Sequence, residues 1–123
     1  MINNFTSIHH VSFIISDINA AKHFYCEVMG LQTDESRPQM SFDGIWLIIN
    51  HSQQIHLLLL DNPDSILRPE HGGRDRHAAF KVKDLSAIKA RLDEYDISYT
   101  VSKSGREALF CRDPDGNTLE LIA

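Results

Sequence analysis

The sequence predicts an α+β fold made of two βαβββ modules, whose curved sheets form a metal-containing cleft. Three observations lead to this prediction. A histidine, an apolar strand and an aspartate occur twice with the same spacing. Each copy continues into a segment with helical periodicity, and each then ends in short strands joined by turns. A repeat of this kind determines the fold class, so it is considered before the single elements.

The two modules open with similar predicted strands. VSFIIS (11–16) follows His10, and AAFKVK (78–83) follows His77. Both segments are rich in the β-branched, aromatic and small residues that are typical of strands. The two histidines therefore hold equivalent places in the repeat.

An aspartate after each strand marks the start of a helix. Asp17 and Asp84 each lie seven residues after the histidine of their module. An aspartate at this place can accept hydrogen bonds from the free amides of a first helical turn. The first helix is expected to end at Gly30. The apolar residues at helical spacing are Ile18, Ala21, Phe24, Tyr25 and Val28 in the first module, and Leu85, Ile88, Leu92 and Tyr95 in the second.

Three further strands follow each predicted helix. They cover about 32–36, 41–50 and 54–60 in the first module, and 98–102, 106–112 and 117–122 in the second. DPDGN favours the last hairpin, because proline fixes φ and Asp-Gly-Asn tolerates left-handed backbone. The 123 residues are therefore expected to form a single domain, 1–123, with repeats at about 7–61 and 75–123.

The segment between the modules, 62–75, is predicted to be an irregular linker. Pro63, Pro69 and two glycines keep it out of regular structure. The glycines of HGG (71–73) are expected to provide turning freedom.

Composition restricts the partners and the compartment. With 42% apolar and 24% charged residues, the chain can enclose a core. The net charge of −5 offers no basic surface for nucleic acid. Because no apolar run approaches the roughly 20 residues of a membrane span and no signal peptide is evident, we expect a cytoplasmic protein that binds neither nucleic acid nor membrane. Cys26 and Cys111 indicate two reduced thiols.

Four side chains of metal-ligand type occupy matched places in the repeat. His56, in QIHLLLL, corresponds to Glu120, in TLELIA. His10 and His56 are separated by 46 residues, and His77 and Glu120 by 43. Alternate residues of a strand share a face, so the curved sheets would direct all four groups into one cleft. Three imidazoles and a carboxylate suit one divalent transition metal per site (Zn, Ni, Fe, Mn or Co) better than Ca or Mg.

The individual assignments differ among these residues. His10, His77 and Glu120 are predicted metal ligands, since an ionised glutamate between two leucines is costly to bury without a partner. His56 is either a fourth ligand, or a base or substrate-binding residue beside the metal. The remaining histidines have no repeated place and are assigned to surface or hydrogen-bonded structural roles; they are His9, His23, His51 and His71.

These residues give the chain a resemblance to the vicinal oxygen chelate superfamily, which includes glyoxalase I, fosfomycin-resistance thiol transferases, bleomycin-binding proteins and extradiol dioxygenases. The likeness covers nearly the whole chain and is carried by HHVSFIISDINAAKHFYCEVMGL and FCRDPDGNTLELI. RPEHGGRDRHAAF and SGREALFCRDPDGNTLE are most similar to small glyoxalase-like proteins. The resemblance implies that His10, His77 and Glu120 are metal ligands and that His56 stands where glyoxalase I carries a glutamate.

The resemblance also implies a reaction class. Family members use the metal as a Lewis acid on two neighbouring substrate oxygens. We therefore expect a divalent-metal-dependent, glyoxalase-like lyase or isomerase acting on a small oxygen-bearing molecule, with Glu120 as catalytic base and His56 as second catalytic candidate. Two alternatives stay open. One is an iron-dependent extradiol-type dioxygenase, and the other is a non-catalytic, resistance-type protein that binds a small molecule.

Five more side chains are candidates for substrate binding: Arg74, Arg76, Arg106, Trp46 and Phe110. The arginines would hold a carboxylate, phosphate or thiol-conjugate tail. The aromatic residues either line the pocket or pack in the core. The alternative for the arginines is surface ion pairing with Asp75, Glu107 or Asp113.

Family members commonly form dimers with modules exchanged between chains. The resemblance therefore implies a homodimer with two equivalent sites. If the sites are shared, His10 and His56 come from one subunit and His77 and Glu120 from the other; otherwise each site lies within one chain.

Overall fold

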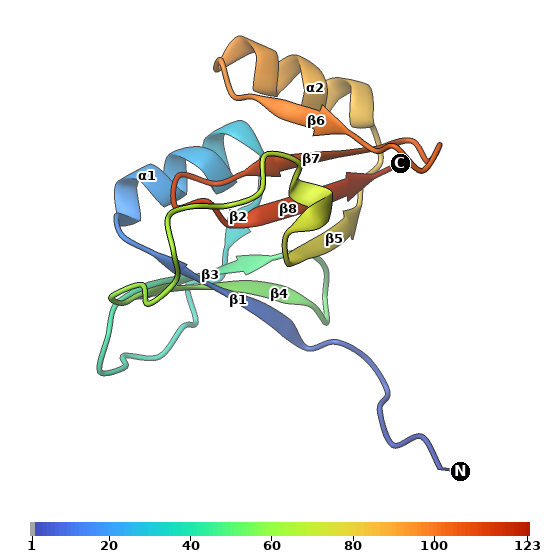
Figure 1. Ribbon diagram of the computed structural model, residues 1–123. Helices are drawn as coiled ribbons and strands as arrows, with labels where there is room; N and C mark the ends of the chain where they lie inside the picture. Colours follow the sequence, from blue (N-terminus) through green and yellow to red (C-terminus); the bar gives the residue numbers. More distant parts are fainter. Residues whose placement is uncertain (1) are drawn as a thin grey trace.

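A computed structural model describes residues 2–123 and contains two four-stranded sheets with the same internal order (Figure 1). The first sheet has the order β1-β4-β3-β2, with β1 (His10–Ile15), β4 (Gln54–Leu59), β3 (Gly44–Ile48) and β2 (Gln32–Thr33). The second has the order β5-β8-β7-β6, with β5 (His77–Lys81), β8 (Thr118–Ile122), β7 (Ala108–Arg112) and β6 (Tyr99–Val101). The predicted α+β fold of two βαβββ modules is confirmed.

The repeat extends to the register of single residues. In the parallel pair β1 and β4, His10 lies opposite Gln54. In the parallel pair β5 and β8, His77 lies opposite Thr118. Since each of these partners precedes the second candidate ligand by two residues, His56 and Glu120 also hold equivalent places.

The helical segments are α1 (Ile18–Lys22), the π-helix η1 (His23–Val28), the 3₁₀ turn η2 (Gly72–Arg74) and α2 (Leu85–Glu94). The two predicted caps are confirmed, because Asp17 and Asp84 each accept a hydrogen bond from the backbone amide three residues later, at 2.9 and 3.0 Å. Gly30, with φ of +80°, follows the first helical stretch as predicted. The sequence did not predict the π-helical second half of this stretch.

Two strands of the first module are shorter than predicted. The segment 32–36 contributes only Gln32–Thr33 to the sheet. Asp34 turns the chain away there, because its Oδ1 accepts hydrogen bonds from the amide and hydroxyl of Ser36 at 2.9 and 2.6 Å. Similarly, Asn50 Oδ1 accepts hydrogen bonds from the amides of Ser52 and Gln53, which ends β3 at Ile48. Side chains that bond to nearby backbone compete with the sheet in this way.

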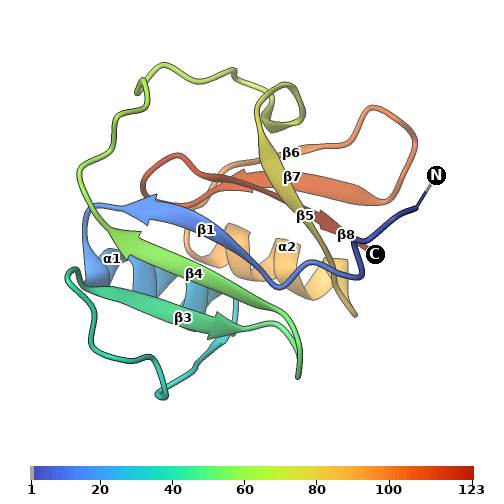
Figure 2. The same ribbon diagram turned by 90° about the horizontal axis from the view of Figure 1, so that it is seen from below.

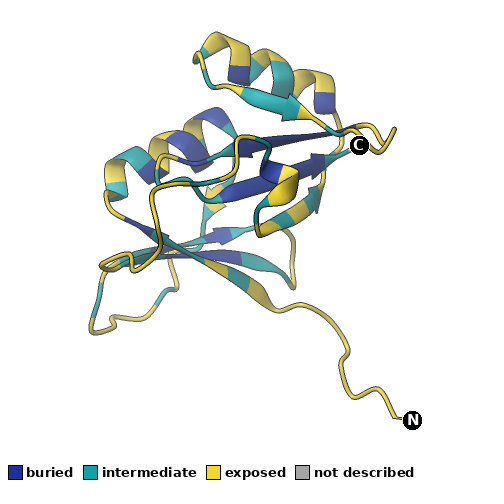
Figure 3. Ribbon diagram, viewed as in Figure 1, coloured by how far each residue is buried: buried dark blue, intermediate teal, exposed yellow. Residues whose placement is uncertain are grey.

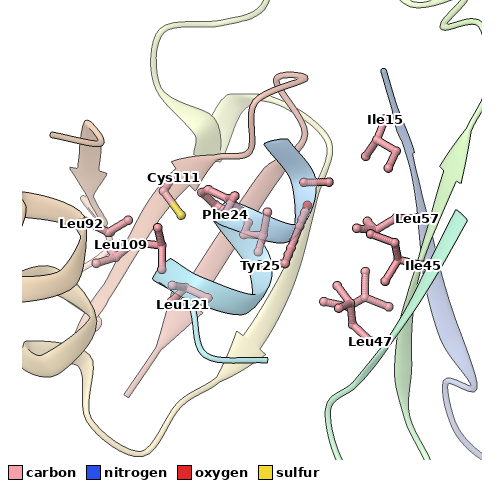
Figure 4. Close-up of a cluster of buried hydrophobic side chains, with 14 of the residues drawn as sticks. Ile15, Phe24, Tyr25, Ile45, Leu47, Leu57, Leu92, Leu109, Cys111 and Leu121 are labelled. Atoms are coloured by element: carbon pink, nitrogen blue, oxygen red, sulfur yellow. The ribbon is translucent and has the colours of Figure 1, made fainter. Parts of the chain in front are cut away.

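The first helical stretch packs between the core sides of the two sheets. Figure 4 shows Phe24 and Tyr25 with side chains of one sheet on either side. The labelled neighbours are Ile15, Ile45, Leu47 and Leu57 from the first sheet, and Leu109, Cys111 and Leu121 from the second. Burial raises the pKa of Cys111 to about 12, so this unpaired thiol packs as an apolar side chain. The first helical stretch and α2 lie on the core side of the sheets, so the opposite faces carry neither of them.

The DPDGN turn joins the two modules as well as β7 and β8. Asp113 Oδ2 accepts a hydrogen bond from the buried hydroxyl of Tyr25 at 2.7 Å. Asn117 Nδ2 donates to the carbonyl of Ile14 at 2.9 Å. Residues of both edge strands, β1 and β5, line one cleft, and the two strands lie near the middle of the molecule in Figure 2. The turn therefore holds the two modules together and, with them, the open faces of their two sheets.

Solvent exposure differs between the central strands and the connecting segments (Figure 3). Buried residues lie mainly in β3, β4, β7 and β8 and on the inner sides of α1, η1 and α2, whereas residues 60–70 and the segment before β1 are mostly exposed. None of the helices within residues 2–123 has both the length and the apolar character needed to cross a membrane.

Candidate metal centre

All four predicted ligands lie on strand positions that face away from the core. The residues that flank His56 and Glu120 in β4 and β8 belong to the hydrophobic core. Because strand side chains alternate, His56 and Glu120 point to the opposite faces of their sheets. Both are nevertheless buried, with 8% and 3% of their surface exposed. A carboxylate and an imidazole that are buried on the sheet faces turned away from the core need hydrogen-bonding or charged partners.

An aromatic residue lies beside each of these groups. Trp46 is opposite His56 in the register of β3 and β4, and Phe110 is opposite Glu120 in β7 and β8. The indole stacks on His56 with ring centroids 4.4 Å apart and planes at 6°. Phe110 meets His77 edge to face at 5.2 Å. Both aromatic residues therefore lie beside the candidate ligands, and Phe110 is itself buried, with 6% of its surface exposed.

In the second module, His77 and Glu120 form a close pair. His77 Nδ1 lies 2.8 Å from the carbonyl oxygen of Asp75, which can only accept, so Nδ1 carries the proton. His77 Nε2 lies 3.1 Å from Glu120 Oε1, so it donates to the carboxylate when it is protonated and can share a cation with it when it is not. A histidine that donates one N–H to a carbonyl and presents the other nitrogen is the common arrangement of a metal ligand.

The second oxygen of this carboxylate has an ion-pair partner but no hydrogen bond. Glu120 Oε2 is buried and makes no hydrogen bond. Arg106 Nη2 lies 3.2 Å away as an ion pair, without hydrogen-bond geometry, and its side chain is largely exposed. A buried acceptor without a donor fits a cation, so the pair in the second module suits a divalent metal.

The pair in the first module is arranged differently. His10 stacks on His56 with centroids 3.9 Å apart and planes at 17°. Nitrogen lone pairs lie in the plane of the ring, so two stacked rings cannot both point at one ion. His56 Nε2 contacts Gln54 Oε1 at 2.8 Å, and Gln54 Nε2 donates to Asp34 Oδ2 at 2.8 Å. The amide of Gln54 therefore holds the proton of His56 on Nε2.

The environment of His56 keeps its ring neutral. Burial, followed by the nearby His10 and His9, lowers the pKa of His56 to about 4. At neutral pH the imidazole thus carries one proton and one free lone pair. This state suits a hydrogen-bonding or proton-transfer role beside a metal as well as it suits ligation.

The two pairs do not meet within one chain. Across residues 2–123, no three or more His, Cys, Asp or Glu side chains gather in a group that could hold a metal ion. His10 and His56 belong to the first sheet, and His77 and Glu120 belong to the second. Each pair therefore supplies at most half of the four ligand-type side chains that were predicted to meet in one cleft.

The three candidate arginines differ in their surroundings. Arg106 contacts Glu120 in the site itself. Arg76 pairs with Asp64 of the linker. Arg74, at the end of η2, has no acidic group within ion-pairing distance in the described part of the chain. The ion pairs considered from the sequence, with Asp75, Glu107 and Asp113, are wrong for all three side chains.

The HGG segment covers the open face of the second sheet. A Cβ atom on Gly72 would lie 2.6 Å from Thr118 Cγ2 and 3.0 Å from Phe110 Cβ. Neither Gly72 nor Gly73 has a positive φ, so the prediction of turning freedom is wrong. These glycines allow close packing instead. His71 donates to the carbonyl of Val101 at 3.1 Å and has the structural role assigned to it.

Sequence reasoning missed the residues that support the candidate ligands. Gln54 and Asp34 hold His56. The Asp75 carboxylate bonds Arg68 and Arg112 and so anchors the linker next to His77. The guanidinium of Arg68 holds the pKa of Asp75 well below its usual range despite burial. A signal for Gln54 was present, since it lies two residues before a candidate ligand, as Thr118 does in the second repeat.

Together, the fold and the paired polar groups define a two-module protein with a candidate metal site on open sheet faces. The chain belongs to the Glyoxalase/Bleomycin resistance protein/Dioxygenase superfamily, whose family profile matches residues 7–121. The resemblance drawn from the sequence is therefore confirmed.

Relatives of similar length support the assignment. The chain is 34% identical to the uncharacterized protein YwkD of Bacillus subtilis (strain 168) over 122 residues, which cover 94% of both chains. It is 32% identical to the uncharacterized protein YaeR of Escherichia coli (strain K12) over 124 residues, which cover 93% of both. The crystal structure of a glyoxalase family protein from Enterococcus faecalis aligns with a TM-score of 0.71 and 30% identity, covering 97% of this chain and 98% of that one.

Proposed function

We propose that the protein is a divalent-metal-dependent, glyoxalase-like enzyme that acts on a small oxygen-bearing molecule by lyase or isomerase chemistry. The pairing of His77 with Glu120 carries this proposal. His77 Nε2 lies 3.1 Å from one oxygen of a buried carboxylate, and the other carboxylate oxygen makes no hydrogen bond. Arg106, the cation that pairs with this carboxylate, is largely exposed to solvent, so a purely structural role explains the buried pair poorly.

A second copy of the chain would complete the site. His77 and Glu120 provide two ligands, and a metal site of this type needs at least three from the protein. The complementary pair lies on the other sheet, on a face that is likewise turned from the core. We therefore propose a homodimer in which His10 of one subunit joins His77 of the partner subunit and Glu120 of the partner subunit.

In this arrangement the residues have separate tasks. A bound divalent ion supplies Lewis-acid polarisation of two neighbouring substrate oxygens. Glu120 Oε2, which has no hydrogen-bond donor, takes the proton beside the substrate carbonyl. Neutral His56, fixed by Gln54 and stacked on Trp46, keeps Nδ1 free to accept a hydrogen bond or a second proton. Arg74, free of acidic partners, is available to an anionic group of the substrate.

One observation favours a second candidate function. Trp46, His56 and His10 form a continuous column of stacked rings, with successive centroids 4.4 and 3.9 Å apart. A column of this kind can stack on a planar molecule without catalysis. The alternative is thus a binding protein that sequesters a small ligand on the same face. His10, His77 and Glu120 around iron would instead permit dioxygenase chemistry, since two histidines and a carboxylate leave positions for substrate and O₂.

Elemental analysis of the untagged protein tests the proposal. We expect about one Ni, Zn, Fe, Mn or Co per chain, retained in Glu107→Ala and lost in Glu120→Ala. Glu107 is the matched control because it is an exposed glutamate near the same hairpin. Iron would direct assays to oxygen consumption, and nickel or zinc to isomerisation of thiol conjugates. No metal after anaerobic reconstitution with each ion would overturn the enzyme proposal in favour of ligand sequestration.

A further inference from the structure

Asp75 connects the linker to the candidate centre through two different groups. Its carboxylate accepts two hydrogen bonds from Arg68, at 2.9 and 2.6 Å, and one from Arg112 at 2.7 Å. Only 8% of the side chain is exposed. Arg112 also donates to the carbonyl of Pro69 and to the hydroxyl of Thr118, both at 2.5 Å. Charge-assisted bonds of this density hold a segment firmly, so the linker is fixed against β7 and β8 at this residue.

The main chain of the same residue contacts a candidate ligand. The carbonyl oxygen of Asp75 accepts from His77 Nδ1 at 2.8 Å. Its carboxylate Oδ1 also accepts from the amide of Arg76 at 2.9 Å, which closes a tight local turn. The side chain and the carbonyl group of Asp75 are therefore held in a fixed position relative to each other. The carbonyl sets both the plane of the imidazole and the nitrogen that carries the proton, and thereby aims Nε2 at Glu120.

The internal repeat provides a built-in comparison. The residue two places before His10 is Ile8, which is 63% exposed and offers no carboxylate. His10 Nδ1 faces His9 Nδ1 at 2.8 Å, and no anchored carbonyl takes its place. The two modules therefore match in their candidate ligands but differ in their support. Of the two equivalent histidines, His10 and His77, only His77 has its Nδ1 proton held by an anchored backbone carbonyl before any ion arrives.

We propose that Asp75 is a positioning residue that preorganises His77, so that the second module is the half-site that captures the metal before the first module completes it. This inference rests on the proposed metal-dependent function and assigns a separate task to each module. Arg68 and Arg112 act through Asp75, and none of the three contacts the ion. Removing the negative charge of Asp75 frees the linker and, with it, the carbonyl that holds His77.

The test compares Asp75→Asn with Asp64→Asn. Asp64 is a matched control, because it pairs with Arg76 in the same linker but is 45% exposed and does not contact His77. Nitrogen-15 NMR of the histidine rings in metal-free protein reports the tautomer of His77, and calorimetry with Zn²⁺ or Ni²⁺ reports affinity. We expect His77 to carry its proton on Nδ1 in the wild type and in Asp64→Asn, and to exchange between tautomers in Asp75→Asn. Metal affinity should fall about 10- to 100-fold in Asp75→Asn alone.

Two results would overturn the inference. One is an unchanged His77 tautomer in a folded Asp75→Asn protein, whatever its metal affinity. The other is an equal loss of affinity in both variants. If Asp75→Asn does not fold, Arg68→Gln removes one anchor, and the tautomer of His77 should shift in the same direction. If the wild type binds no metal at all, the proposed function fails, while the tautomer measurement still decides whether Asp75 positions His77.

Discussion

Trp46 and His56 lie face to face, with ring centroids 4.4 Å apart and planes at 6°. His10 extends this stack on the other side of His56. The first module therefore presents an aromatic surface with a neutral imidazole at its centre. The second module presents a carboxylate and an arginine, Glu120 and Arg106. The internal repeat has thus produced two faces of different chemistry that would complement each other across a dimer.

The buried imidazole predicts how stability depends on pH. Burial lowers the pKa of His56 from the ordinary 6.5 to about 4. As the pH falls from about 6.5 to about 4, the unfolded chain takes up this proton and the folded chain does not, so folded stability decreases. His56→Phe keeps a ring in the stack and removes the titration. Relative to this variant, the wild-type free energy of unfolding should fall by about 1.4 kcal/mol per pKa unit of the shift. Chemical denaturation of metal-free protein at several pH values measures it, and a pH-independent difference would contradict the assignment.

Replacing Glu120 with glutamine should separate stability from metal binding. Glutamine keeps the size of the side chain but removes the charge that faces His77 and the largely exposed Arg106, so Glu120→Gln should lower the stability of the metal-free protein only modestly. In the wild type, a metal at 100 times its dissociation constant adds about 2.7 kcal/mol. Thermal unfolding with and without metal should show this gain only in the wild type. Strong destabilisation of the metal-free variant would indicate a structural role for the carboxylate.

Closing the space at Gly72 should disturb the site from outside it. In Gly72→Ala the new methyl group meets Thr118 and Phe110, which we expect to cost about 1–3 kcal/mol and to lift η2 from the sheet. Gly105→Ala is the comparison, since Gly105 has φ of +86° and no atom lies within 4 Å of the place that a Cβ would take. It should cost about 1–2 kcal/mol through the backbone alone. Metal titration of both variants should show weakened binding only for Gly72→Ala; equal affinities would mean that η2 does not shape the site.

The sequence predicted those features that depend on short-range pattern. Asp17 and Asp84 cap their helices, and the places of His10 and His77 agree in the strand registers. Features that depend on tertiary contacts were missed. The role of Gly72 follows from its neighbour Phe110, which lies 38 positions along the chain, and composition gives no sign of it.

The residues of the candidate site could be selected from the sequence, but whether their two pairs come together could not. Matched spacing selects Glu120 because strand periodicity and repeat length are local properties of the chain. Whether two pairs meet depends on how two sheets are turned around a shared helix, which no spacing encodes. The support from Asp75 depends on Arg68 and Arg112, and many arginines in a sequence could equally pair with a given acid.

Mixing two defective variants tests the shared site most directly. One variant carries His10→Ala and His56→Ala, and the other carries His77→Ala and Glu120→Ala. In a heterodimer with shared sites, one site collects all the defects and the other is intact. Random 1:1 co-refolding should then restore about one quarter of the wild-type metal content and activity, because half of the dimers are mixed and each holds one intact site. If each site lay within a single chain, every site would keep a defect, and no recovery in verified heterodimers would contradict the account.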